Sequence, residues 1–246
     1  MLYRILLSAL VAGVLGGVAV AIIQAGTTTP LILEAEAYEG GAEAVPAMLD
    51  GAGLKDPGLI FIAASDDADE EWMPTDGLER TVFTSIATIG ATSGFALILL
   101  SLMVLSGAEI TARKGLMWGA AAFVGTGLAP ALGLSPELPG SAAAALEARQ
   151  LWWIGTAIAT GAGLWLALRI STPAAIGVGV LLIAAPHVVG APHPSAFTST
   201  VPGELSGHFA SASLVVQALS WALAGAIGGY VWQRLAARAE PMASAA

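Results

Sequence analysis

The chain lacks cysteine altogether, and its 246 residues include only three histidines. Disulfide bonds, thiolate metal sites and cysteine nucleophiles are therefore excluded. Charged residues make up only 11% of the sequence, against about 25% in a typical soluble protein. There is also no phosphate-binding loop, no serine nucleophile elbow and no His-Glu-x-x-His zinc motif. These absences argue against a soluble fold, against ATP hydrolysis and against proteolysis.

The chain contains long apolar stretches without charged residues, and 56% of its residues are hydrophobic. Each stretch is close to the length of about 20 residues at which a helix crosses a hydrocarbon core of about 30 Å. Because a helix satisfies its own backbone groups in lipid, we predict an all-α integral membrane protein, a bundle of six transmembrane helices forming one domain over residues 1–246. The predicted spans are residues 5–24, 81–106, 115–134, 151–169, 174–190 and 208–232.

The first stretch also fits part of the signal-peptide pattern, since Arg4 precedes it. Its apolar core of about 19 residues exceeds the usual 7–15 of a signal peptide, which favours a retained helix. The fourth and fifth stretches are separated only by residues 169–173. This short connection predicts a tight antiparallel hairpin, and Pro186 is expected to kink or end the fifth helix.

The charges are sorted by sign between the two sides of the predicted bundle. With the N-terminus inside, the inside gaps contain six of the nine basic residues and only the acids Glu109 and Glu240. These six basic residues are Arg4, Arg113, Lys114, Arg169, Arg234 and Arg238. The positive-inside rule therefore predicts a multi-pass protein with both termini in the cytoplasm.

The first outer loop, residues 25–80, carries 13 acids against Lys55 and Arg80. We expect a short helix near Thr29 and Pro30 at its start, and an acidic, flexible insertion over residues 40–71. Asp76 is predicted to cap the helix of the second span. Such a surface repels nucleic acid and attracts cations over about 10 Å.

All three histidines, His187, His193 and His208, fall on this same outer side of the predicted bundle. Glu204 precedes His208 by four residues, so a helix starting near Pro202 would place both on one face. Imidazole and carboxylate groups together suit Co²⁺, Ni²⁺ or Zn²⁺. We therefore predict a metal site of these four residues with help from Glu34, Glu36 or Glu137. The alternative is that each histidine only caps a helix or lies at the membrane interface.

Few other polar residues enter the spans. Gln217 lies nine residues into the sixth span, about 13 Å deep at 1.5 Å per residue, and either bridges helices or lines a path. No acid or base lies deep in any span, which argues against a buried charge relay. Glycine pairs four residues apart suggest close helix packing. These pairs are Gly13/Gly17, Gly90/Gly94, Gly115/Gly119 and Gly225/Gly229.

Several segments together resemble the CbtA family, the larger membrane subunit proposed for a bacterial cobalt transporter. The resemblance extends from about Tyr3 to Trp232, and its most specific elements are Pro-Glu-Leu-Pro-Gly at 136–140 and Arg-Gln-Leu-Trp-Trp at 149–153. The other matching segments are residues 29–36, 76–81, 128–135, 186–192 and 201–205.

The resemblance implies uptake of Co²⁺ or Ni²⁺ as a transported ion, linked to cobalamin synthesis in the bacterial cytoplasmic membrane. It implies no permanently bound cofactor and a small single-span partner like CbtB, which ends in histidines; a homo-oligomer is left open. Relatives often carry histidines in the first outer loop, where this chain has the acidic run 66–71 without histidine. That loop is then expected to concentrate cations by charge alone.

Two other functions stay open on the sequence. A scaffold or partner subunit that does not itself transport would explain the lack of deep ionisable residues. A membrane-embedded enzyme has least support, since only the outer histidines and glutamates could form a reactive group. The leading interpretation is a membrane subunit of a cobalt importer whose outer His/Glu site admits the ion.

Overall fold

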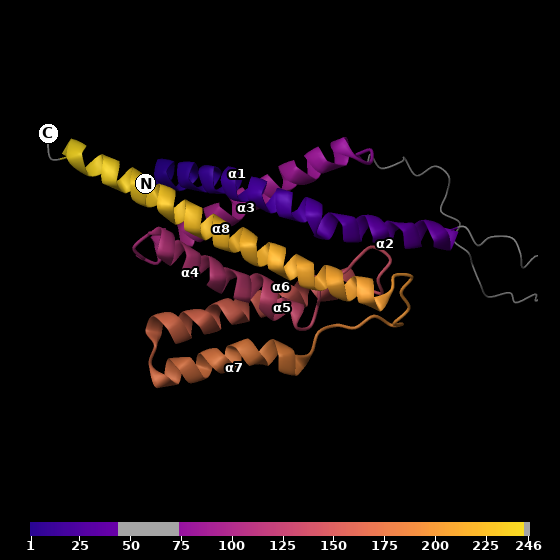
Figure 1. Ribbon diagram of the computed structural model, residues 1–246. Coiled ribbons are helices and arrows are strands. Elements are labelled where there is room, and N and C mark those ends of the chain that lie inside the picture. The colour runs from indigo at the N-terminus through magenta and orange to yellow at the C-terminus, as the bar shows by residue number, and fades with distance from the viewer. Residues whose placement is uncertain (44–73, 244–246) are drawn as a thin grey trace, which may run out of the picture.

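The computed structural model describes residues 1–43 and 74–243, and all regular structure in them is helical (Figure 1). The α-helices are α1 (Leu2–Gly26), α2 (Thr28–Glu43), α3 (Leu78–Leu105), α4 (Ala112–Phe123), α5 (Ala129–Ala131), α6 (Leu146–Trp165), α7 (Pro173–Val189) and α8 (Gly203–Ala243). Two π-helical turns, η1 (Val124–Leu128) and η2 (Leu166–Ile170), interrupt this order. The prediction of an all-α protein is confirmed for the described residues.

Each predicted span coincides largely with a helical segment, but the segments differ in length. Four are long and apolar enough to cross a membrane: Leu2–Gly26, Leu78–Leu105, Leu146–Ile170 and Gly203–Arg238. The fifth stretch forms the shorter apolar helix α7, and the third forms α4, η1 and α5 in succession. Length and composition thus support four spanning helices, and six spans remain a prediction. Of the expected acidic insertion, residues 44–71 lie outside the described residues.

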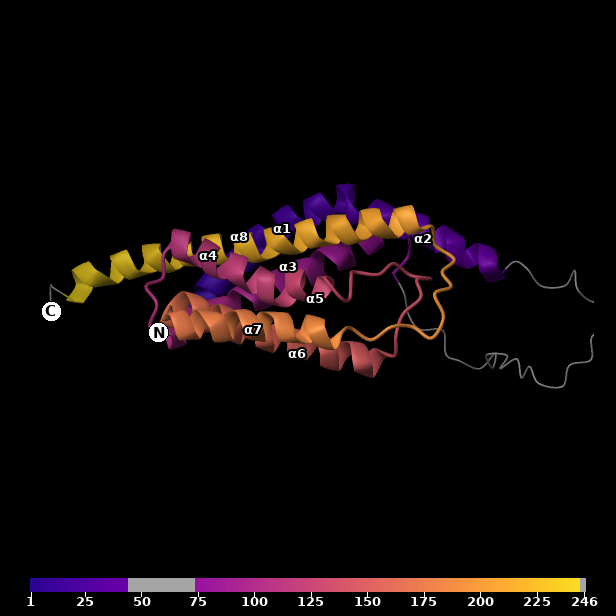
Figure 2. The same cartoon turned by 90° about the horizontal axis from the view of Figure 1, so that it is seen from below.

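Helix α8 occupies the centre of the bundle. It contacts α1 and α3 on one side and α4 on the other; α6 follows beyond α4, and α7 packs against α6 (Figures 1 and 2). Helix α1 begins and α8 ends at one end of the bundle, whereas α2, the start of α8 and the end of α7 lie at the other (Figure 1). We call these the inner and the outer end.

Glycines allow the central helices to approach backbone to backbone. A Cβ atom at Gly225 of α8 would lie only 2.1 Å from the carbonyl oxygen of Gly115 in α4. The α1–α3 contact is similar, since a Cβ at Gly17 would lie 2.6 Å from the Cα of Ile89. Small residues serve this role wherever helices associate in lipid. Three of the four predicted glycine pairs therefore lie at interfaces.

The fourth predicted pair, Gly90/Gly94, does not lie at a helix interface. Among the described residues, no heavy atom that would contact an added Cβ lies within 4 Å of Gly90 or Gly94. The prediction that this pair marks a helix contact is wrong, because spacing alone does not tell which face of a helix meets a neighbour. A contact that spacing missed joins Gly163 to Gly179, where an added Cβ would lie 2.5 Å from a carbonyl oxygen.

The Gly163–Gly179 contact closes the predicted hairpin between α6 and α7. Ser171 adopts the left-handed conformation with φ of 55°, and Thr172 is extended, as a residue before proline prefers. The Thr172 side chain accepts a hydrogen bond from the backbone N–H of Ala175 at 3.2 Å, which caps α7. Helix α7 continues through Pro186 and ends at Val189, with Gly190 as its C-cap, so it does not end at Pro186.

The π turn η1 has a cause in the sequence. Pro130 has no N–H to donate to the carbonyl of Thr126, and its ring crowds that carbonyl. The helix widens by one residue over Val124–Leu128 to relieve this conflict. Turns of this kind often lie at functional sites.

The buried residues form a core at the inner half of α1, α3 and α8. This core includes Ala9 and Ala12 of α1, Leu100 and Met103 of α3, and Ala224 of α8. The outward faces of the same helices expose large apolar side chains, such as Leu10, Leu15 and Ile98. That pattern is expected where lipid is the solvent.

We expect Gly225→Ala to destabilise the bundle, because the added methyl would meet the Gly115 carbonyl and force α4 and α8 apart. Overpacking of this kind costs about 1–3 kcal/mol, so the melting temperature in detergent should fall. Tryptophan fluorescence measures the transition. Gly94→Ala, at an open helical position, is the matched control and should melt no lower than the parent. Equal melting of both variants would contradict the contact.

Candidate functional site

The seven residues predicted to bind metal all lie toward the outer end. Glu34 and Glu36 are on α2, His187 is in the last turn of α7, and Glu204 and His208 are in the first turns of α8. Glu137 and His193 lie in the connections before α6 and α8. Their common end agrees with the predicted arrangement of the spans.

The side chains do not converge into one metal centre. Among the side chains described, those of residues 1–38 and 74–238, no three His, Asp or Glu groups are close enough to hold an ion. Glu204 and His208 lie four apart on α8, as predicted, and both are exposed. Glu34 and His193 are exposed as well. Any site built from these residues would need ligands outside the described residues, from a partner, or from water.

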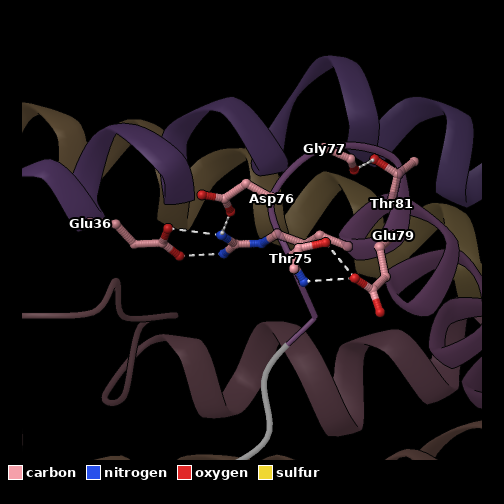
Figure 3. Close-up of polar contacts among 7 residues, drawn as sticks. Glu36, Thr75, Asp76, Gly77, Glu79 and Thr81 are labelled. Carbon is pink, nitrogen blue, oxygen red and sulfur yellow. Dashed lines mark hydrogen bonds and ion pairs between the residues drawn. The ribbon is translucent and has the colours of Figure 1, made fainter.

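Glu36 is instead held by an arginine, at the junction of α2 and α3 (Figure 3). The Arg80 guanidinium donates to both carboxylate oxygens of Glu36, one of them at 2.9 Å. It also donates to Asp76 at 3.1 Å. Both Glu36 and Arg80 are about a third exposed, at 35% and 28% of the side chain. This paired geometry, the strongest form of ion pair, fixes α2 to the start of α3.

The prediction that Asp76 caps α3 is wrong, because the Asp76 carboxylate pairs with Arg80 instead. The N-cap position is taken by Gly77 at φ of 95° with no side-chain cap bond in the described chain. Glu79 lies in the first turn as expected, and its carboxylate accepts from the Thr75 backbone N–H at 3.0 Å (Figure 3). The Thr75 hydroxyl donates to the same oxygen.

Glu137 is held in a similar way. Arg149 of α6 approaches its carboxylate at 2.6 Å, and both side chains are largely covered. A small apolar cluster lies at the same outer end, where Ala35 of α2 and Leu138 contact Val201 and Leu205 near the start of α8. Two of the predicted metal ligands therefore join outer segments to one another.

His187 packs between α7 and α6. Its ring lies edge-on to Trp152, with centroids 5.9 Å apart, and the Trp152 indole N–H donates to the Pro186 carbonyl at 3.3 Å. The His187 Nε2 atom is buried without a hydrogen-bond partner among the described residues. Water or an ion could reach this nitrogen only if the side chains that cover it moved.

A cavity of about 330 Å³ lies between α1, α2, α3 and α8, toward the outer end. We call it the outer cavity. Hydroxyl and amide groups form its polar lining, and no charged side chain is among the described residues that line it. The polar lining consists of Gln24, Thr28, Thr88, Thr92, Ser213, Gln217 and Ser220.

Only Gln217 of this lining was singled out by sequence. Its amide lies against η1, since a Cβ at Gly127 would be 2.5 Å from the Gln217 Oε1 atom. Spacing could have found the others, because Ser213, Gln217 and Ser220 lie four and three residues apart on one face of α8. Thr88 and Thr92 repeat the pattern on α3, and Thr88 donates to the Gln24 amide oxygen at 2.7 Å.

Comparison with known families finds one match. The profile of the family described as "Probable cobalt transporter subunit (CbtA)" matches residues 2–233. No curated protein and no solved structure matches the chain.

A double-mutant cycle of Arg80→Ala and Glu36→Ala should show that the two side chains stabilise the fold together. We expect a coupling of about 0.5–1 kcal/mol in detergent unfolding, since the pair is partly solvated and screened. Glu34→Ala, which removes an exposed acid two residues away, is the control and should not couple to Arg80. Additive effects of the Arg80 and Glu36 variants would contradict the pairing.

Proposed function

This chain belongs to the CbtA family of probable cobalt transporter subunits, and from that premise we propose that it is the membrane subunit of an importer for Co²⁺ or a similar divalent transition metal. The single observation that carries the proposal is the family match over residues 2–233. A family of transporter subunits is not a family of enzymes. In this proposal the imported metal is used for the synthesis of cobalamin.

We further propose six spans with both termini on the cytoplasmic side of the bacterial inner membrane. Six helical runs support the number, and the predicted inside gaps support the orientation. At the inner end Arg169 donates to the Ser106 carbonyl at 3.0 Å, and Arg4 lies 5.6 Å from the Trp232 ring. Lys114 pairs with Glu109 at 2.6 Å and lowers the pKa of that carboxyl through its hydrogen bond and charge. An excess of Lys and Arg is typical of the cytoplasmic side, whereas aromatic residues are enriched at both interfaces.

The ion would first meet an outer site of His187, Glu204 and His208, with His193 beside it. Their shared end of the bundle supports this assignment, and the buried His187 Nε2 atom has no hydrogen-bond partner among the described residues. Glu34 would add charge, whereas Glu36 and Glu137 would act chiefly through their arginines. Imidazole with carboxylate is the ligand set that Co²⁺ and Ni²⁺ accept.

A partner completes the proposal. The description as a subunit implies a second protein, and we propose a small single-span chain similar to CbtB whose histidines would add ligands at this site. The second candidate function is a scaffold that does not itself transport. The observation that favours a scaffold is the absence of any three-ligand group among the described residues.

Cysteine labelling should establish the orientation, since the chain has no native cysteine. In intact cells, His193→Cys should react with a membrane-impermeant maleimide, because residue 193 lies at the proposed periplasmic end. Arg113→Cys should react only after the membrane is permeabilised. Labelling of residue 113 but not 193 in intact cells would show that the bundle is inverted.

The combined variant His208→Ala and Glu204→Gln should reduce ⁵⁷Co²⁺ accumulation several-fold at limiting cobalt, because it removes an imidazole and a carboxylate from one face of α8. Cells producing the chain with its partner are used, and Glu147→Gln, an exposed acid of α6, is the control. Unchanged accumulation of ⁵⁷Co²⁺ would contradict the proposed outer site. Uptake by liposomes that contain only this chain would exclude the scaffold.

A further inference from the structure

The outer cavity occupies only one half of the helices that form it. Its lining begins at Val20 and Gln24 of α1, Thr88 of α3 and Phe209 of α8, all in the outer half of the bundle. Toward the inner end the same three helices carry the buried core, in which Leu100 and Met103 have no exposed surface. The outer cavity therefore extends from the outer end to about the middle of the bundle.

Two aromatic rings lie where the cavity ends. Phe95 lines the cavity, and Trp221 follows the lining residue Ser220. Their rings are stacked with centroids 4.3 Å apart and an angle of 12° between planes. Leu99 and Leu100 are fully buried one turn further in. The stack and these side chains close the cavity on its inner side.

The larger part of the cavity surface is apolar, and its polar groups are neutral hydroxyls and amides, with neither imidazole nor carboxylate among the described residues that line it. Neutral hydroxyl and amide oxygens are poor replacements for the water ligands of Co²⁺, which prefers nitrogen donors. Removing a divalent ion from water without such replacement is prohibitively costly. The same oxygens are good acceptors for water bound to a metal, because the metal polarises its O–H bonds.

The size of the cavity fits an ion that keeps its water. Six waters at about 30 Å³ each take about 180 Å³, which is well within the cavity volume of about 330 Å³. Gln217 lines this cavity, and its amide lies beside Gly127 of η1, where an added Cβ would be 2.5 Å from the Gln217 Oε1 atom. Thr92 of α3 lines the same cavity, and its hydroxyl is fixed by the hydrogen bond that it donates to the Thr88 carbonyl at 2.8 Å.

We propose that the outer cavity binds the transported divalent cation as its intact aqua ion, through hydrogen bonds from the metal-bound waters to Gln217, Thr92 and Ser213. This inference rests on the proposed function and assigns the form in which the metal passes beyond the outer end. No metal–ligand bond forms or breaks in this step. The His/Glu site at the outer end would then collect ions without stripping them.

Cobalt(III) hexaammine tests the inference, because it resembles an aqua ion in size, donates hydrogen bonds and does not exchange its ligands. Competition with ⁵⁷Co²⁺ uptake is measured in cells that contain the chain and its partner. The hexaammine ion should inhibit the parent, and inhibition should weaken roughly tenfold in Gln217→Leu and in Thr92→Val, since each removes a hydrogen bond to a charged species. Ser211→Ala, an exposed serine of α8 outside the lining, should behave as the parent.

Purified protein gives a readout that does not depend on transport. Hexaammine should raise the melting temperature of the parent and of Ser211→Ala, but raise that of Gln217→Leu and Thr92→Val much less. Equal shifts in all four proteins, or uptake that hexaammine does not inhibit, would overturn the cavity assignment and leave the importer intact. If the chain gives no ⁵⁷Co²⁺ uptake above an empty vector, the proposed function fails, and the assignment of a transported ion fails with it.

Discussion

The close approach of α4 to α8 is the contact on which the rest of the bundle depends. At Gly115 and Gly225 each helix presents a carbonyl oxygen where the other would carry a side chain. Further along, Gly119 faces the backbone of Trp221, so the same seam fixes the residue that closes the outer cavity. In lipid the hydrophobic effect does not drive helices together, and such close packing supplies the association instead. The small residues thus determine both the bundle and the position of its aromatic stack.

The positions of the charged residues also follow from the lipid that surrounds the helices. Ionised groups are costly in hydrocarbon, and the ion pairs in the described residues, such as Arg80–Glu36 and Arg149–Glu137, lie at helix ends. The middle of the bundle is left with hydroxyl and amide groups. A protein built in this way can hold a cation within the membrane only if the ion brings its own ligands, and water is the ligand that every divalent ion carries.

The sequence predicted those features that depend on local pattern. Apolar length predicted the helices, the short connection 169–173 predicted the turn between α6 and α7, and the four-residue spacing placed Glu204 with His208. It did not predict the pairing of Glu36 with Arg80, because 44 residues separate them and the nearer acid Asp76 suggested a helix cap. The outer cavity was missed because its polar groups come from four helices. Their spacing on α3 and α8 was visible, but which faces meet depends on the glycine seams.

The inner half of the bundle contains polar atoms that its packing does not satisfy. The Ser8 hydroxyl and the Trp221 indole N–H are buried without hydrogen-bond partners among the described residues, and a group in this condition costs about 1–3 kcal/mol. Water reaching this half would satisfy both. The backbones beside the stack are in tight contact at Gly17–Ile89 and Gly119–Trp221, so separating the helices would break the seams. Rotation of the Phe95 and Trp221 side chains would lose their ring contact, worth about 0.5–1.5 kcal/mol beyond area burial, together with the packing of Trp221, which is buried. Both routes toward the inner end therefore break packed contacts, and the stack and the seams together keep this half of the bundle closed.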